Sequence, residues 1–115
     1  MKHFILLFSV LLMTQVGSAH VIMQDDEGMI KAKAKELTEK YKAEIGLDVD
    51  QTMKFETIVV NYMIKKHKAK KLNVSEVDKN GIIGQLGDQE NEDMADLLSK
   101  GQYKKYLKAK KILQP

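Results

Sequence analysis

The sequence predicts an all-α protein, a small bundle or cradle of about four helices that follows a cleaved signal peptide. Three observations support this fold class. Apolar residues recur at intervals of three and four residues, no segment alternates apolar and polar residues as a half-buried strand would, and a motif that starts helices occurs twice. The 115 residues leave room for one domain, and because the chain has no cysteine, no disulfide can stabilise it.

The first nineteen residues have the composition of a secretory signal peptide. A short positive start precedes an apolar run over residues 4–13, and small residues end the segment at residues 17–19. The apolar run is too short for an ordinary membrane-spanning helix. We therefore expect residues 1–19 to be removed by cleavage near His20. The mature protein is expected in the periplasm or in the medium as a secreted protein, with no membrane span after cleavage.

Residues 20–28 are expected to form a flexible leader, and residues 29–115 a single helical domain. The first helix of this domain is predicted from residue 29 to residue 45. Its apolar stripe follows helical spacing: Ile30, Ala34, Leu37, Tyr41 and Ile45. Gly46 comes next, at the position where a glycine with positive φ commonly ends a helix.

The motif that starts helices is Leu47-Asp48-Val49-Asp50-Gln51, and it returns as Leu98-Ser99-Lys100-Gly101-Gln102. In each copy a leucine precedes a capping residue, and a glutamine follows the cap by three positions. The capping side chain can accept a hydrogen bond from the first turn of the helix, and the glutamine can reach back to the cap. We expect two helices to begin at tight corners. The motif residues are Leu47, Asp48, Gln51, Leu98, Ser99 and Gln102.

The second helix is predicted from Val49 to about residue 71, and its apolar residues cover about 240° of the helix circumference. Such a helix is central to the domain, forms half of a dimer contact, or presents an open apolar face to protein clients. The sequence leaves these three interpretations open. The candidate dimer or client surface consists of Phe55, Ile58, Val59 and Tyr62.

All nineteen basic residues are lysine, and the absence of arginine argues against specific recognition of nucleic acid. Lysines gather at the end of the second helix and again in the last helix. They are either solvated helix ends or a patch for an anionic partner such as lipid, polysaccharide or an acidic client segment. The candidate patch consists of Lys65, Lys66, Lys68, Lys70, Lys71, Lys104, Lys105 and Lys108.

Residues 72–98 form the least regular part of the chain. Asn73 or Ser75 can start a helix, Gly81, Gly84 and Gly87 weaken it, and Asp88 can start another, so the segment is one helix or two. The second motif then starts the final helix. Residues 73–99 carry seven acids and one lysine, a net charge of −6, whereas residues 100–115 carry six lysines and no acid. Adjacent antiparallel helices with these charges would attract each other.

No constellation of catalytic residues is recognisable, and we expect a protein that is not an enzyme and binds no metal or cofactor. The expected mature protein has two histidines, His20 in the leader and His67 in the helical domain. No Gly-x-Ser-x-Gly motif occurs in the chain. Residues 76–87 match part of a calcium-binding EF-hand loop, but Gly87 stands where that loop needs a glutamate. The acids fit a solvated helix face better than a catalytic pair. They are Asp88, Glu90, Glu92, Asp93 and Asp96.

The two motifs and the order of the elements resemble the Spy/CpxP-like family of small periplasmic proteins, which carries two Leu-Thr-x-x-Gln motifs. Asp48 and Ser99 replace the threonines here and preserve the capping chemistry. The resemblance spans about residues 25–112. It implies a helical cradle, usually a homodimer, that acts in envelope stress without ATP. Some relatives sense metals through histidines that this chain lacks.

The expected function is therefore that of an exported helical binding protein. It would act like a chaperone on protein clients, or bind the sensor domain of an envelope-stress system. The alternative is a lysine-rich protein that binds surfaces of anionic lipid or polysaccharide.

Overall fold

The computed structural model describes residues 26–115, and four helices without any strand make up this part of the chain. The predicted signal peptide and residues 20–25 of the predicted leader lie outside the described residues. The N-terminal helix covers residues 26–45, so residues 26–28, predicted as leader, are already helical. It ends as the sequence predicts: Gly46 has a φ of 80°, and its N–H donates to the carbonyl of Lys42 at 2.9 Å.

Three further helices follow, α2 (Val49–Lys70), α3 (Glu76–Leu97) and α4 (Lys100–Leu113). The question of whether residues 75–98 form one helix or two is settled by the structure, because α3 is continuous over 22 residues. Its cap is Ser75, whose side chain accepts a hydrogen bond from the N–H of Asp78 at 3.1 Å. The three glycines of α3 therefore lower its helix propensity without breaking it.

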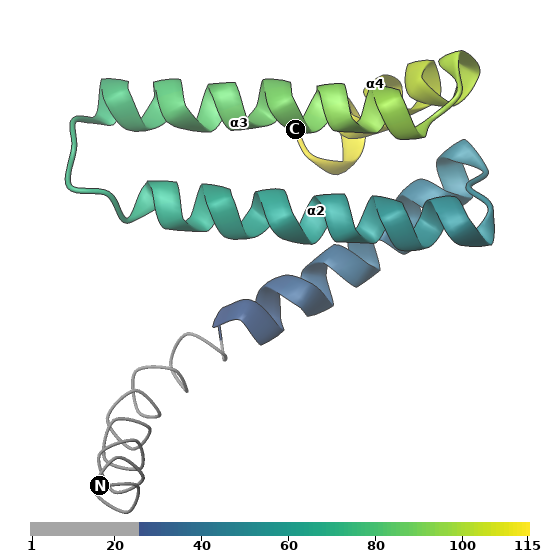
Figure 1. The fold of residues 1–115 in the computed structure, drawn as a ribbon, viewed down its shortest axis with the longest axis horizontal. Helices are drawn as coiled ribbons and strands as arrows, with labels where there is room; N and C mark the ends of the chain where they lie inside the picture. The colour runs from purple at the N-terminus through teal and green to yellow at the C-terminus, as the bar shows by residue number, and fades with distance from the viewer. Residues whose placement is uncertain (1–25) are drawn as a thin grey trace, which may run out of the picture.

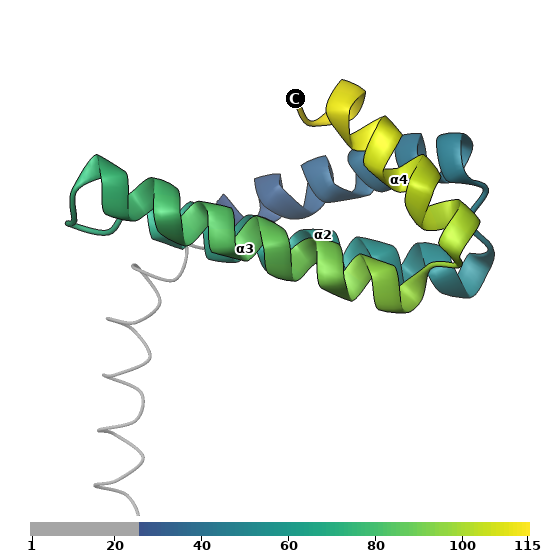
Figure 2. The same cartoon turned by 90° about the horizontal axis from the view of Figure 1, so that it is seen from above.

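The helices form two layers. α2 and α3 lie side by side as an antiparallel hairpin (Figure 1), and the N-terminal helix and α4 both lie on one face of that hairpin (Figure 2). α4 lies over the half of the hairpin that is far from the α2–α3 turn. Among the described helices, none covers the opposite face of the hairpin. Within residues 26–115, no helix is both long and apolar enough to cross a membrane.

The core lies between the two layers and is centred on three aromatic rings. Tyr41 of the N-terminal helix packs on Phe55 of α2 with a centroid distance of 5.1 Å, and Tyr106 of α4 lies 5.4 Å from Tyr41 and 5.9 Å from Phe55. Tilted aromatic pairs of this kind contribute about 0.5–1.5 kcal/mol each beyond the burial of their surface. Met94 of α3 is fully buried beside them, so all four helices share one core.

One hydrogen bond fixes the C-terminal end of the chain to this core. The hydroxyl of Tyr41 donates to Oε1 of Gln114 at 2.6 Å, across 73 residues of sequence. Burial raises the pKa of the hydroxyls of Tyr41 and Tyr106 above the ordinary tyrosine value. Both therefore stay protonated at neutral pH and remain hydrogen-bond donors.

Candidate functional site

Both repeated motifs form complete capping boxes in the structure. The side chain of Asp48 accepts from the N–H of Gln51 at 2.7 Å, and Oε1 of Gln51 accepts in return from the N–H of Asp48 at 3.2 Å. In the second copy, Ser99 accepts from the N–H of Gln102 at 3.2 Å, and Oε1 of Gln102 accepts from the N–H of Ser99 at 3.0 Å. Each box satisfies two backbone donors that would otherwise lack a partner.

The two boxes are also bonded to each other, which the sequence did not predict. Nε2 of Gln51 donates to Oε1 of Gln102 at 2.8 Å, and Nε2 of Gln102 donates to Oε1 of Gln51 at 3.0 Å. Leu47 and Leu98, the first residue of each motif, are both buried in the core. The corner that starts α2 and the corner that starts α4 therefore form one structural unit.

Three of the four residues of the candidate dimer or client surface on α2 are buried, so they cannot form an open surface in this structure. Phe55 has no exposed surface and packs on Tyr41 of the N-terminal helix and Tyr106 of α4. Val59 belongs to the same core, and Tyr62 is also buried, with its hydroxyl bonded to Asp93 of α3. Ile58 is partly buried against the same core. Of the three interpretations of the apolar helix, the structure shows that α2 is central to the domain.

The predicted lysine patch is divided into two groups. Residues 65–71 lie in the last turns of α2, next to the α2–α3 turn, whereas residues 104–108 lie in the first half of α4, near the other end of the hairpin (Figure 1). Three lysines of the first group also have partners inside the protein. Nζ of Lys71 lies 3.4 Å from a carboxylate oxygen of Asp26. Lys66 donates to the carboxylate of Glu90 at 3.0 Å, and Nζ of Lys65 lies 4.8 Å from the centre of the Tyr62 ring.

Glu90 was predicted on a solvated face, and this prediction is wrong. Glu90 is only 3% exposed and lies between Lys66 of α2 at 3.0 Å and Lys110 of α4 at 4.0 Å. Nζ of Lys110 also donates to Oδ1 of Asn91 at 2.7 Å, and partial burial lowers the pKa of Lys110. The result is a buried ion-paired network that joins three helices.

A neighbouring polar contact also joins α2 to α3. The hydroxyl of Tyr62 donates to a carboxylate oxygen of Asp93 at 2.6 Å. This hydrogen bond to a charged acceptor raises the pKa of Tyr62 to about 12. Asp93 itself is exposed, so the contact brings a carboxylate to the open face of the hairpin.

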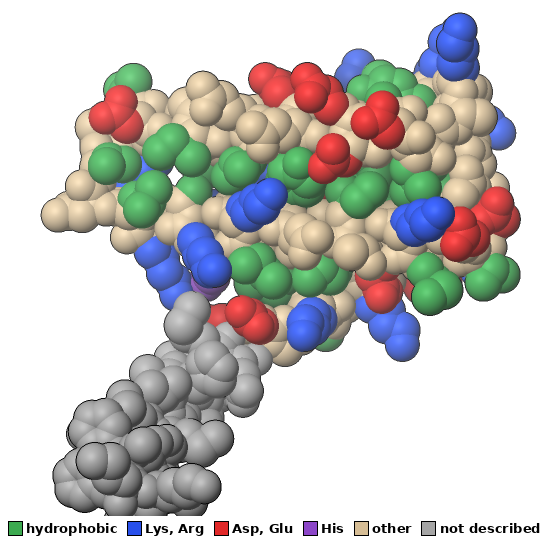
Figure 3. Space-filling model, viewed as in Figure 1, with side chains coloured by type: hydrophobic (Ala, Val, Ile, Leu, Met, Phe, Trp, Pro, Cys, Tyr) green, Lys and Arg blue, Asp and Glu red, His purple; other side chains and the backbone are tan. Residues whose placement is uncertain are grey.

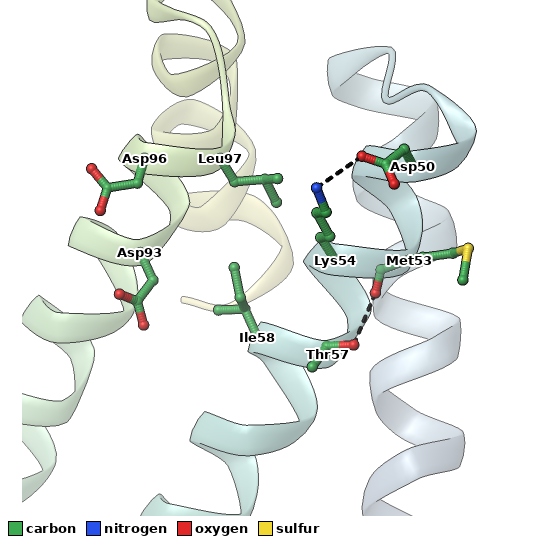
Figure 4. Close-up of a pocket in the computed structure, with 8 residues that line it drawn as sticks. All are labelled: Asp50, Met53, Lys54, Thr57, Ile58, Asp93, Asp96 and Leu97. Carbon is green, nitrogen blue, oxygen red and sulfur yellow. Dashed lines mark hydrogen bonds and ion pairs between the residues drawn. The ribbon is translucent and has the colours of Figure 1, made fainter.

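That open face carries the best candidate site, a groove of about 620 Å³ between α2 and α3. Ile58 and Leu97 lie between the two helices at its centre (Figure 4), and both are partly exposed. Met53 lies at one edge with 67% of its surface exposed. The remaining lining residues are polar: Asp50, Lys54, Thr57, Asp93 and Asp96.

Negative charge borders this groove. Lys54 pairs with Asp50 at 3.0 Å, so these two side chains largely cancel. Asp93 and Asp96 are exposed and form no ion pair with any of the described residues. Acidic side chains are also seen along α3 in the space-filling view (Figure 3). The groove therefore combines an apolar floor with an acidic border.

Sequence reasoning missed this groove, although part of its signal was present. Ile58 belonged to the candidate surface of α2, but the pairing of α2 with α3 was unknown. Within residues 26–115, no group of three or more histidine, aspartate or glutamate side chains is placed to hold a metal ion. Comparison of the chain with protein-family models, with curated proteins and with solved structures found no match in any of the three.

Proposed function

We propose that this protein is a non-catalytic binding protein that acts outside the cytoplasm and holds segments of unfolded protein clients in the groove between α2 and α3. The observation that carries this proposal is the groove itself, an apolar floor of Ile58 and Leu97 on a helical face that no described helix covers. The binding partner is either an unfolded client or the exposed segment of an envelope-stress sensor domain. The resemblance of the two capping motifs to those of Spy/CpxP-like proteins supports the same class of function.

The chemistry of the groove selects a particular kind of segment. Its apolar floor suits a short run of apolar side chains, and its border of Asp93 and Asp96 suits lysine or arginine next to that run. Met53 is flexible and polarizable, so it can adapt to apolar side chains of different shape. The preferred occupant is therefore an apolar segment with basic neighbours.

The size of the groove predicts weak and reversible binding. Burying two or three apolar side chains contributes roughly 1.5–3 kcal/mol each. Association costs at least about 4 kcal/mol in lost freedom of motion, and the unfolded client also loses conformational entropy. The difference is at most about 5 kcal/mol before the entropy loss of the client is counted. The dissociation constant is therefore expected in the high micromolar to millimolar range. Such binding delays aggregation of a client without storing it permanently.

A homodimer, which the family resemblance implies, would have to form through a surface other than the buried Phe55, Val59 and Tyr62. Light scattering of the purified protein measures the oligomeric state directly. A monomer would still offer the groove, because all of its lining residues come from one chain.

An aggregation assay tests the proposal. A chemically unfolded client is diluted into buffer with the protein, and light scattering follows its aggregation. We expect the parent to delay aggregation and the Met53→Gln, Leu97→Gln double variant to lose most of this effect. The matched control is Leu107→Gln, Ile112→Gln, which removes two exposed apolar side chains from α4. Glutamine keeps helix propensity in all four positions.

The proposal is contradicted if the parent protein delays no client at low or high salt. Equal losses in the two double variants would also exclude the groove as the site. In a peptide-binding experiment, apolar peptides with flanking lysines should bind more tightly than the same peptides with flanking glutamates. This difference should shrink at high salt, whereas apolar binding itself should persist.

A further inference from the structure

The end of the α2–α3 hairpin carries exposed apolar side chains that do not line the proposed groove. We call residues 65–79 the hairpin tip. Leu72 and Val74 in the turn are 44% and 43% exposed, and Val77 in the first turn of α3 is 81% exposed. The turn over residues 72–75 extends beyond the helices of the second layer in both ribbon views (Figures 1 and 2). Earlier in the tip, His67 and Lys71 contact Asp26 at the start of the N-terminal helix. The three apolar side chains are therefore exposed at one end of the hairpin.

Lysines are close in sequence to the same apolar side chains. The hairpin tip contains six lysines and two acidic residues. Lys68 and Lys70 are exposed and form no ion pair with the described residues, and Lys71 lies 3.4 Å from Asp26 with 63% of its side chain exposed. Lys66 and Lys79 are engaged by Glu90 and Glu76. Lys68 and Lys70 are thus unpaired among the described residues, and Lys71 remains largely exposed although it pairs with Asp26.

The presence of exposed apolar side chains together with lysines favours one class of anionic partner over the others. A polysaccharide would use the lysines but gain nothing from Leu72, Val74 and Val77. A protein partner would need a pocket into which this turn fits. A lipid bilayer uses both features, because apolar side chains enter the boundary between headgroups and acyl chains while lysines contact anionic headgroups.

We infer that the hairpin tip docks on anionic lipid bilayers, with Leu72, Val74 and Val77 inserted into the headgroup region and Lys68, Lys70 and Lys71 against the lipid phosphates. Neither feature is sufficient alone, since stable attachment to a membrane surface takes two signals. Binding is therefore reversible, requires anionic lipid and weakens with salt.

Docking through the tip leaves the proposed groove accessible. Ile58 at the centre of the groove is separated from Lys70 by about 18 Å along α2, at about 1.5 Å per residue. The groove also lies on the half of the hairpin that is far from the tip. A tip-bound molecule would therefore hold its groove away from the bilayer surface.

Single tryptophan variants test this inference, because the chain has no tryptophan of its own. The Val77→Trp variant reports on the tip, and the Ile112→Trp variant places the same probe at an equally exposed position on α4. On vesicles of phosphatidylglycerol and phosphatidylcholine, the emission of Val77→Trp should shift to shorter wavelength and be quenched by brominated acyl chains. Ile112→Trp should show neither effect, and vesicles of pure phosphatidylcholine should produce neither effect in either variant.

The apolar run of residues 4–13 is common to all full-length variants, so binding through that run would leave both tryptophans in water. Such a result, with protein on the vesicles and Val77→Trp emission unchanged, would overturn the inference. The second test compares matched lysine pairs. Lys70→Gln, Lys71→Gln should weaken vesicle binding by about fivefold or more, whereas Lys104→Gln, Lys105→Gln on α4 should change it by less than about twofold. Equal losses in the two pairs would show general charge attraction and contradict docking by the tip.

Discussion

The side chains of Gln51 and Gln102 each perform two tasks. Oε1 of each accepts the N–H of its own cap residue, while Nε2 of each donates to the other glutamine. The pair therefore couples two corners that are 51 residues apart in sequence. A capping box that acted alone would stabilise only its own helix.

We expect a double-mutant cycle to detect this coupling. Gln51→Ala and Gln102→Ala should each lower the free energy of unfolding by about 1–2 kcal/mol, because each breaks one box and the link. The double variant should lose about 1 kcal/mol less than the sum, since the link is lost only once. Urea unfolding measures all four free energies. Strict additivity would mean that the two amides do not interact in solution.

A separate prediction concerns the contribution of the capping residues Asp48 and Ser99 to stability. Asp48→Ala and Ser99→Ala should each cost about 1 kcal/mol of unfolding free energy, because the alanine leaves an N–H of the first turn without its acceptor. Asp48→Asn and Ser99→Thr retain an acceptor and should cost much less. Unchanged melting temperatures in both alanine variants would show that these side chains do not act as caps.

At the scale of the element, α3 is unusual because three glycines interrupt a helix that is nevertheless continuous. A Cβ atom added at Gly81 or Gly84 would meet no other atom within 4 Å. Gly81→Ala and Gly84→Ala should therefore raise the free energy of unfolding by up to about 1 kcal/mol each. Gly46→Ala provides the contrast, because its φ of 80° disfavours a side chain and the variant should be less stable. Thermal and urea unfolding measure whether the two α3 variants are more stable than the parent and whether Gly46→Ala is less stable.

The contact between α2 and α3 predicts a dependence on alkaline pH. The pKa of Tyr62 is raised to about 12 by its hydrogen bond to Asp93, from about 10 in an unfolded chain. Its contribution to stability is therefore fully present below pH 10 and is lost as the pH rises toward 12. Tyr62→Phe should cost about 1 kcal/mol at pH 7 and show a smaller decline between pH 10 and 12. An unchanged decline would exclude Tyr62 as its source.

The helices were largely predictable from the sequence, and their partners were not. The stripe of Ala34, Tyr41 and Ile45 follows from spacing alone, and the caps follow from residue type. Both ends of α2 and the start of α4 therefore agree with the prediction to about one residue. The wide apolar arc of α2 gave no indication of which side another helix would cover. The sequence therefore left open whether Phe55 is buried or lies on a surface, and in the structure Tyr41 and Tyr106 pack against it.

At the scale of the whole molecule, Glu90 shows why a buried site escaped prediction. Its acidic surroundings suggest a solvated face, but it lies four residues before the buried Met94 and therefore points in the same direction. The acidic composition of the segment does not indicate that Glu90 is buried. Its position on the helix does, once the inner side of α3 is known. Lys66 and Lys110 could be recognised as its partners only after the helices were placed in two layers.

The network around Glu90 connects α2, α3 and α4, so its removal should affect the whole fold. Glu90→Gln would leave Lys66 and Lys110 close together without the carboxylate between them. Because both lysines retain some access to water, we expect a loss of about 3 kcal/mol, at the low end for a broken buried ion pair. The control is Glu92→Gln on the exposed side of α3, which should change the free energy of unfolding by less than about 0.5 kcal/mol. Urea unfolding with circular dichroism measures both variants. A loss in Glu90→Gln that equals that of Glu92→Gln would mean that the buried charges do not support the arrangement of these three helices.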